Sequence, residues 1–151
     1  VVSANQFSCS PVRVFSSMRT QDSLEENTSS FYAELKRLRQ LLEMADEANQ
    51  APVFYLLDEI LKGTNSADRH RGAEALIKQL HPKNSAGFVS THDLELGEWG
   101  ATENYVHNFH FRSDMENGKL HFDYKLHEGI CRSFNASELM RMMGIDMGPE
   151  K

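Results

Sequence analysis

The sequence predicts an α/β fold in which helices flank a sheet, and three observations support this prediction. Two short apolar runs, Val53–Leu57 and Gly87–Thr91, have the composition of strands that are buried on both faces. A helical pattern over Asp68–Leu80 separates them, which is the strand–helix–strand order of a parallel βαβ unit. Polar residues follow both runs, at the edge where open α/β sheets bind ligands.

The composition suits one domain, or part of a larger one, because 40% of the 151 residues are hydrophobic. No apolar run approaches the ~20 residues of a membrane-spanning helix, and no charged-then-apolar leader opens the chain. Since the net charge is −6, we expect any grip on DNA phosphates to lie outside this chain. The first residue is Val1 rather than Met, which suggests a fragment, and the isolated Cys9 and Cys131 are expected to be free thiols.

Two strands and a long helix are expected before the first apolar run. The strands are predicted over Val1–Ser10 and Pro11–Ser17, and a polar loop over Ser23–Ser30 follows them. The helix is predicted over Ser30–Ala48, where apolar residues recur at helical spacing. Its expected buried stripe consists of Phe31, Leu35, Leu38, Leu42 and Ala45.

The later part of the chain predicts a hairpin and a short closing helix. The helix over Asp68–Leu80 should end at His81, because a residue before proline is pushed out of the helical region. Glu116-Asn117-Gly118 is a strong hairpin signal, and Phe122, Tyr124 and Leu126 alternate along one expected face. The remaining predicted elements are a loop over Leu94–Asn104, strands over Val106–Arg112 and Lys119–Leu126, and a helix over Ala136–Met143 that stops at Gly144.

Two adjacent acids, Asp58 and Glu59, follow the first apolar run directly. Carboxylates at the exit of a buried strand are costly to place without a partner or a task. In nucleotide-hydrolysing sheets one such acid holds Mg²⁺, and a neighbouring acid can orient and deprotonate the attacking water. The alternative is a pair of strand-end acids that caps a following helix, and the two residues alone leave both readings open.

Two further features point to anion chemistry at the same edge. His92 follows the second apolar run, as the acids follow the first. Thr28, Ser29 and Ser30 place hydroxyls and free backbone N–H groups at the start of the long helix, where anions are favoured. We therefore expect the acids, the imidazole and the helix start to converge around a phosphate-bearing ligand.

Three motifs in this order resemble the ATPase domain of the MutS family of DNA mismatch repair proteins. They are R-T-Q-D-S-L-E-E-N-T-S-S-F-Y-A-E-L over Arg19–Leu35, F-Y-L-L-D-E-I-L-K-G-T-N-S-A-D-R over Phe54–Arg69, and S-T-H-D-L-E-L over Ser90–Leu96. The resemblance extends over nearly the whole chain. It implies a P-loop NTPase sheet of the ABC-ATPase type, flanked by helices and incomplete, with a C-terminal β-hairpin and a short helix.

The resemblance also implies roles for individual residues. Asp58 resembles the Walker B acid that holds Mg²⁺ through water, Glu59 the general base, and His92 the switch histidine that senses the γ-phosphate of ATP. Ser29, followed by Ser30, resembles the signature serine that reaches the nucleotide of the other subunit. The residues that resemble the loop crossing the dimer interface are Asn65, Ser66 and Asp68.

One part of the family pattern is absent. The phosphate-cradling loop G-x-x-x-x-G-K-[ST] does not occur in this chain, and in the family it lies just upstream of the matching region. Residues 1–151 are therefore interpreted as a partial ATPase domain that binds ATP weakly and does not hydrolyse it alone. Glu25, Glu26 and Asn27 stand where the family often has glycine, which puts the strength of the signature contact in question.

The expected function is ATP binding and hydrolysis in a MutS-like DNA-binding protein, where nucleotide state sets the geometry of a dimer that clamps DNA. The resemblance implies ATP and Mg²⁺ as cofactors. It implies ATP or ADP, a second copy, and mismatched or damaged DNA held by other domains as partners, in a cytoplasmic, nucleoid-associated protein without membrane contact. Two alternatives remain: a metal-dependent phosphoesterase or nuclease using Asp58, Glu59 and a histidine, and a non-catalytic dimerisation module.

Overall fold

The computed structural model describes residues 4–18, 30–116, 119–132, 140–146 and 148. The chain divides into two compact units, Val1–Leu96 and Gly97–Lys151. The described residues contain no helix long and apolar enough to cross a membrane. The α/β class predicted from the sequence is confirmed, with one parallel and one antiparallel sheet.

The first unit contains a three-stranded parallel sheet in the order β1-β2-β3. The strands are β1 (Arg13–Ser17), β2 (Val53–Asp58) and β3 (Ser85–Ser90). Two helices connect them, α1 (Ser30–Ala45) between β1 and β2, and α2 (Ser66–Leu80) between β2 and β3. The predicted βαβ unit is thus confirmed, and a second strand–helix–strand unit precedes it.

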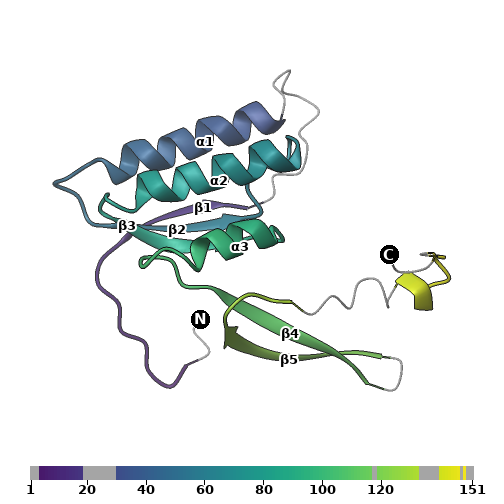
Figure 1. The fold of residues 1–151 in the computed structure, drawn as a ribbon. Helices are drawn as coiled ribbons and strands as arrows, with labels where there is room; N and C mark the ends of the chain where they lie inside the picture. The colour runs from purple at the N-terminus through teal and green to yellow at the C-terminus, as the bar shows by residue number, and fades with distance from the viewer. Residues whose placement is uncertain (1–3, 19–29, 117–118, 133–139, 147, 149–151) are drawn as a thin grey trace. The chain divides into compact units, whose positions relative to one another are not determined.

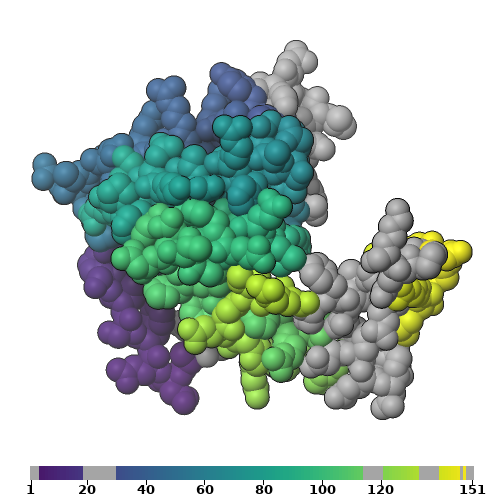
Figure 2. All heavy atoms as spheres, in the orientation of Figure 1, coloured from purple at the N-terminus to yellow at the C-terminus, as the bar shows by residue number. Residues whose placement is uncertain are grey.

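Both helices lie side by side over one face of this sheet (Figure 1). Figure 2 shows the blue atoms of α1 next to the teal atoms of α2 on the visible face. The core between the layers is apolar, because each helix turns one stripe toward the sheet. Its buried side chains are Leu38, Leu41 and Ala45 of α1, Ala73, Leu76 and Leu80 of α2, and Val53 and Leu57 of β2.

The predicted stripe of α1 was partly wrong. Leu38 and Ala45 are buried as expected, but Leu35 is 40% exposed and Leu42 is only half-buried. Leu41, which the stripe omitted, is fully buried. The face that meets the sheet passes through positions 38, 41 and 45, a spacing of three and then four residues that the sequence pattern did not single out.

Three predicted boundaries are corrected by the structure. Residues 4–10 form no strand, and the edge strand begins only at Arg13, after Pro11, which lacks a backbone donor. Helix α1 ends at Ala45 rather than Ala48. The segment predicted as a loop over Leu94–Asn104 instead contains helix α3 (Leu94–Gly100), because Asp93 caps it by accepting a hydrogen bond from the Leu96 N–H at 3.1 Å.

The second unit contains the predicted hairpin, formed by β4 (Phe109–Glu116) and β5 (Lys119–Glu128). The first strand begins at Phe109, three residues after the predicted start, and the Asn117-Gly118 turn lies outside the described residues. Phe111 pairs with Leu126 and Ser113 with Phe122, so β5 bulges between these pairs.

The bulge breaks the alternation that the sequence predicted for β5. Tyr124 adopts a left-handed φ of 53° within it, and Asp123 accepts a hydrogen bond from the Lys125 N–H at 3.0 Å. Phe122, Tyr124 and Leu126 are all exposed, so no buried face runs along this strand in the described residues.

Only part of the predicted closing helix is described. Residues 140–142 are helical, and residues 133–139, with the proposed cap Asn135, lie outside the described set. Gly144 has a φ of 83°, and the Ile145 N–H donates to the Met140 carbonyl at 3.0 Å. This is a glycine stop of the Schellman type, as the sequence predicted for Gly144.

Candidate functional site

The predicted site residues that the structure describes lie at one edge of the parallel sheet or beside it. Each strand is followed by a helix that runs back across the sheet, so the carboxyl ends of β1–β3 and the amino ends of α1 and α2 lie at the same edge (Figure 1). Ligands bind at this edge in open α/β sheets.

Asp58 is the last residue of β2 and is half-buried. Ser90, its register partner at the end of β3, donates its hydroxyl to Asp58 Oδ1. The hydrogen bond orients the carboxylate, because Ser90 itself is held in the parallel ladder. A carboxylate and a hydroxyl therefore stand together at the sheet edge, and both are hard oxygen donors of the kind that Mg²⁺ prefers.

Glu59 and His92 come together at the same edge. The Glu59 Oε1 atom lies 2.7 Å from His92 Nε2, and the Glu59 N–H donates to the Ser90 carbonyl at 3.0 Å. The Glu59 side chain is 17% exposed, whereas that of His92 is 93% exposed. A solvent-exposed imidazole thus contacts a mostly buried carboxylate, and the two groups are close enough to bind the same ligand atom.

Lys62 is a partner of Glu59 that sequence reasoning missed. Its ammonium group forms an ion pair with Glu59 Oε2, so the two carboxylate oxygens face an imidazole and an ammonium. The contact is possible because Glu59 and Leu61 have left-handed φ values of 47° and 61°, which fold the chain back after β2. The spacing of three residues between the charges was the available signal.

The turn after β2 is held on both sides by the helices. The Leu61 N–H donates to Glu34 Oε1 of α1 at 2.6 Å. A Cβ atom added to Gly72 of α2 would lie 2.6 Å from the Leu61 side chain, and one added to Gly63 would lie 2.6 Å from Phe31 of α1. The two glycines therefore let both helices approach the turn that carries Glu59, and Glu34 is a second positioning residue that the sequence did not reveal.

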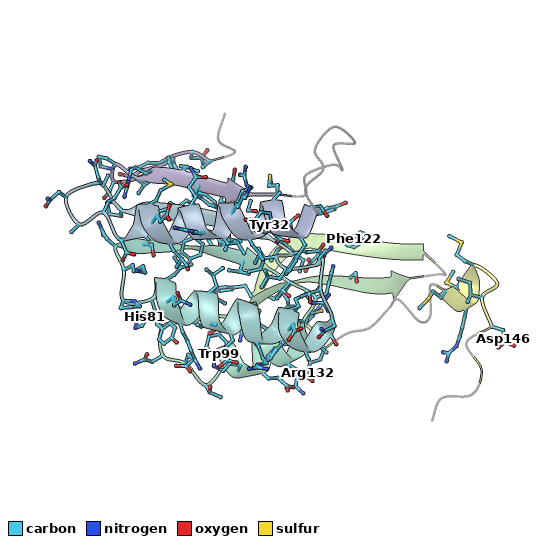
Figure 3. All side chains as sticks on the ribbon, turned by 90° about the horizontal axis from the view of Figure 1, so that it is seen from above. Tyr32, His81, Trp99, Phe122, Arg132 and Asp146 are labelled. Atoms are coloured by element: carbon cyan, nitrogen blue, oxygen red, sulfur yellow. The ribbon has the colours of Figure 1, made fainter. Side chains whose placement is uncertain are left out.

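The start of α1 is only partly visible. Ser30 is the first residue of the helix and is exposed, whereas Thr28 and Ser29 lie outside the described residues. Figure 3 shows Tyr32 near this end of α1; the residue is 54% exposed, and its ring centroid lies 4.6 Å from Lys36 Nζ. The amino end of α1 thus presents a hydroxyl, an aromatic ring and a cation to solvent.

The loop predicted from Asn65 to Asp68 is the cap of α2. Asn65 Oδ1 accepts from the Asp68 N–H at 2.9 Å, and its Nδ2 donates to Asp68 Oδ2 at 2.7 Å. Ser66 and Asp68 therefore lie in the first turn of the helix, which begins two residues earlier than predicted. This reciprocal pair fixes the amino end of α2 while leaving its side chains exposed.

The comparison with known protein families gives one match over almost the whole chain. The family described as MutS domain V matches residues 1–146. The DNA mismatch repair protein MutS 2 of Haloarcula marismortui is 30% identical over 134 residues, which cover 88% of this chain and 14% of that protein. The DNA mismatch repair protein MutS of Lactobacillus delbrueckii subsp. bulgaricus is 34% identical over 134 residues, covering 88% and 15%.

A relative with a different printed name matches the same share of the chain. Endonuclease MutS2 of Symbiobacterium thermophilum is 27% identical over 133 residues, covering 88% of this chain and 16% of that protein. The chain therefore spans about one seventh of the length of the first relatives it matches. Because the family match covers the strands, the helices and the candidate site, the chain belongs to the MutS domain V family.

Proposed function

We propose that this chain is the carboxyl-terminal part of the ATPase domain of a MutS-like DNA mismatch repair protein. Membership of the MutS domain V family and the names of two relatives support this assignment. The parallel β1-β2-β3 sheet with acids at its carboxyl edge supports a P-loop NTPase sheet of the ABC-ATPase type. Hydrolysis and DNA recognition belong to the longer protein, of which this chain supplies part of the catalytic edge.

The observation that carries the proposal is the 2.7 Å contact between Glu59 Oε1 and His92 Nε2. In this assignment Glu59 accepts the proton of the attacking water as general base. His92 contacts the γ-phosphate, so that the position of the carboxylate responds to the nucleotide state. Lys62 forms an ion pair with the second carboxylate oxygen of Glu59 and would help to hold the side chain in place.

Asp58 and Ser90 fit a magnesium site by their donor chemistry. The carboxylate of Asp58 would hold Mg²⁺ through water, and the Ser90 hydroxyl keeps that carboxylate in position. Bound Mg²⁺ would neutralise charge on the β- and γ-phosphates. Asp58 is the last residue of β2 and Glu59 is the first residue after it. Because the end of the strand is fixed, Asp58 would stay at the metal and Glu59 at the attacking water.

A second copy of the domain would complete each site. Ser29 and Ser30 at the start of α1 would reach the nucleotide of the partner, where the free N–H groups of the helix favour an anion. Asn65, Ser66 and Asp68 would cross the interface, and the reciprocal Asn65–Asp68 hydrogen bonds hold that cap ready. Mismatched or damaged DNA would be held by other domains, in keeping with the net charge of −6.

Two exposed apolar side chains of the parallel sheet agree with a partial domain. Val14 and Phe88 are 63% and 62% exposed on the face opposite the helices, and Phe88 packs edge-on against Phe54 at 5.8 Å between ring centroids. Parallel sheets are normally covered on both faces. We expect the rest of the ATPase domain, with its G-x-x-x-x-G-K-[ST] loop, to cover these residues.

The test uses the full-length protein that carries this chain. We expect Glu59→Gln to lower the single-turnover rate of ATP hydrolysis by about 10²- to 10⁴-fold while ATP binding is kept, because the amide cannot accept the proton. Glu43→Gln on the exposed face of α1 is the matched control and should keep the normal rate. An unchanged hydrolysis rate in Glu59→Gln would refute the assignment.

The 151-residue chain by itself gives a second test. We expect it to bind ATP weakly and not to hydrolyse it, because the phosphate-cradling loop is absent from its sequence. Cleavage of a phosphodiester with divalent metal but without ATP would favour the phosphoesterase alternative. Stable dimers of the chain that form regardless of nucleotide would favour a non-catalytic pairing role, and light scattering would detect them.

A further inference from the structure

A group of three potential metal ligands lies outside the residues assigned to the nucleotide. His70 of α2, Asp93 and Glu95 each offer one donor atom, and these atoms all lie within 4.8 Å of one another. His70 Nδ1 lies 3.2 Å from Asp93 Oδ2. Among the described residues, this is the only group of three or more His, Cys, Asp and Glu donors gathered so closely.

Local structure fixes the Asp93 carboxylate with one oxygen directed at His70. Asp93 Oδ1 accepts from the Leu96 N–H at 3.1 Å and caps α3. The Asp93 N–H in turn donates to Thr91 Oγ1 at 3.0 Å. Because Oδ1 accepts the hydrogen bond from α3, Oδ2 is the oxygen that faces the imidazole. The same oxygen would bind a metal ion.

The charges around the imidazole favour a cation. Glu74 Oε2 lies 3.8 Å from His70 Nε2, and Glu74 Oε1 pairs with Lys78 Nζ at 2.5 Å. Three carboxylates therefore surround one imidazole, and one ammonium offsets them. The side chains of His70 and Asp93 are only 20% and 13% exposed, so water screens this negative charge less than at an open surface.

We propose that His70, Asp93 and Glu95 bind a divalent transition metal ion, with Zn²⁺ and Mn²⁺ as the ions suited to one imidazole and two carboxylates. Donors at about 2.1 Å from a tetrahedral zinc ion are about 3.4 Å apart, and the 3.2 Å between His70 and Asp93 is close to that value. Glu95 is exposed, and one of its carboxylate oxygens lies within 4.8 Å of the other two donor atoms, so it can supply the third ligand. Water would fill the remaining position.

The ion would connect α2 with the segment that follows β3. His70 lies in α2, shortly after the Asn65 cap, and Asp93 directly follows His92. A metal bridging them would fix the segment that carries His92 against the helix that carries the proposed interface cap. The site uses neither Asp58 nor Glu59, so metal binding at it can be measured without nucleotide.

The test measures metal binding without nucleotide. Zn²⁺ and Mn²⁺ are titrated into the full chain by competition with a chromophoric chelator and by calorimetry, with thermal unfolding followed in parallel. We expect His70→Ala and Glu95→Gln to weaken binding at one site by at least about tenfold. Both variants keep the Asp93 cap of α3, and their unfolding curves without metal show whether each is folded. The metal should also raise the melting temperature of the wild type but not of His70→Ala.

His107→Ala removes an exposed histidine outside this group and is the matched control. Mn²⁺ serves as the second probe because it disfavours thiolates and so avoids Cys9 and Cys131. Equal metal affinity in the wild type and His70→Ala, or no binding of either ion, would overturn the proposal. Either result would leave the Glu59→Gln test of ATP hydrolysis unaffected.

Discussion

The two sheets of this protein differ in how their apolar residues are used. In the parallel sheet, helices α1 and α2 cover one face, and Leu41, Val53 and Leu80 are at most 1% exposed. In the hairpin, Phe109, Phe111 and Leu126 are each more than half exposed. A two-stranded hairpin gains little stability unless something packs on it. The difference shows that helix packing over the parallel sheet, rather than strand pairing, gives the candidate site a rigid base.

Truncation of one leucine of α1, which packs on the parallel sheet, and of one leucine of the hairpin should give the largest contrast. We expect Leu41→Ala to lower the free energy of unfolding by about 3 kcal/mol, because it leaves a cavity between α1 and the sheet. Leu126→Ala, at 57% exposure, should change it by less than about 0.5 kcal/mol. Urea denaturation measures both values, and equal losses would show that the hairpin is part of the same core.

A glycine in each unit gives a second, smaller contrast. A Cβ atom on Gly87 would lie 2.0 Å from the Tyr55 carbonyl oxygen, whereas one on Gly97 would lie 3.4 Å from Ile130. Gly87→Ala should therefore lower the free energy of unfolding by about 1–3 kcal/mol, because the β2–β3 ladder must shift. Gly97→Ala lies in helix α3 and should be neutral or slightly stabilising. Thermal unfolding of the two variants would measure the contrast, and a neutral Gly87→Ala would contradict the tight β2–β3 packing.

The smallest effect is expected in the bulge of β5. The hydrogen bond from the Lys125 N–H, followed by the contact with His127, lowers the pKa of Asp123 from its usual 3.8. A lowered pKa in the folded state means that the ionised form stabilises the bulge above pH 3.8 and that this contribution is lost as the pH falls through the lowered value. Amide NMR shifts of Lys125 should follow this acid titration, and Asp123→Asn should abolish it.

Much of the fold could be predicted because its signals are local. The apolar run before Asp58, the Asn-Gly signal between the two hairpin strands and the glycine at position 144 are local signals, so β2, the strand pairing of the hairpin and the helix stop were expected correctly. The loop predicted after Asp93 was wrong because the Asp93 cap favours a short helix there, although the apolar pattern of that segment is weak. The extra strand before Pro11 was wrong because strand formation needs a partner, which sequence periodicity does not supply.

The candidate site also combines features that the sequence predicted with contacts that it did not predict. The sequence by itself determined that acids and a histidine leave adjacent strands at one edge, because parallel strands joined by helices end on the same side. The roles assigned to Asp58, Glu59 and His92 stay predictions that the resemblance implies and that mutation can test.

Only the tertiary structure decided which side chains meet. The Glu34–Leu61 and His70–Asp93 contacts join residues 27 and 23 positions apart, and neither follows from any local pattern. The same holds for Leu41, whose burial depends on how α1 is rotated over the sheet. Local periodicity selects helices and strands, whereas packing between them selects the rotation, the turn geometry and the charge partners.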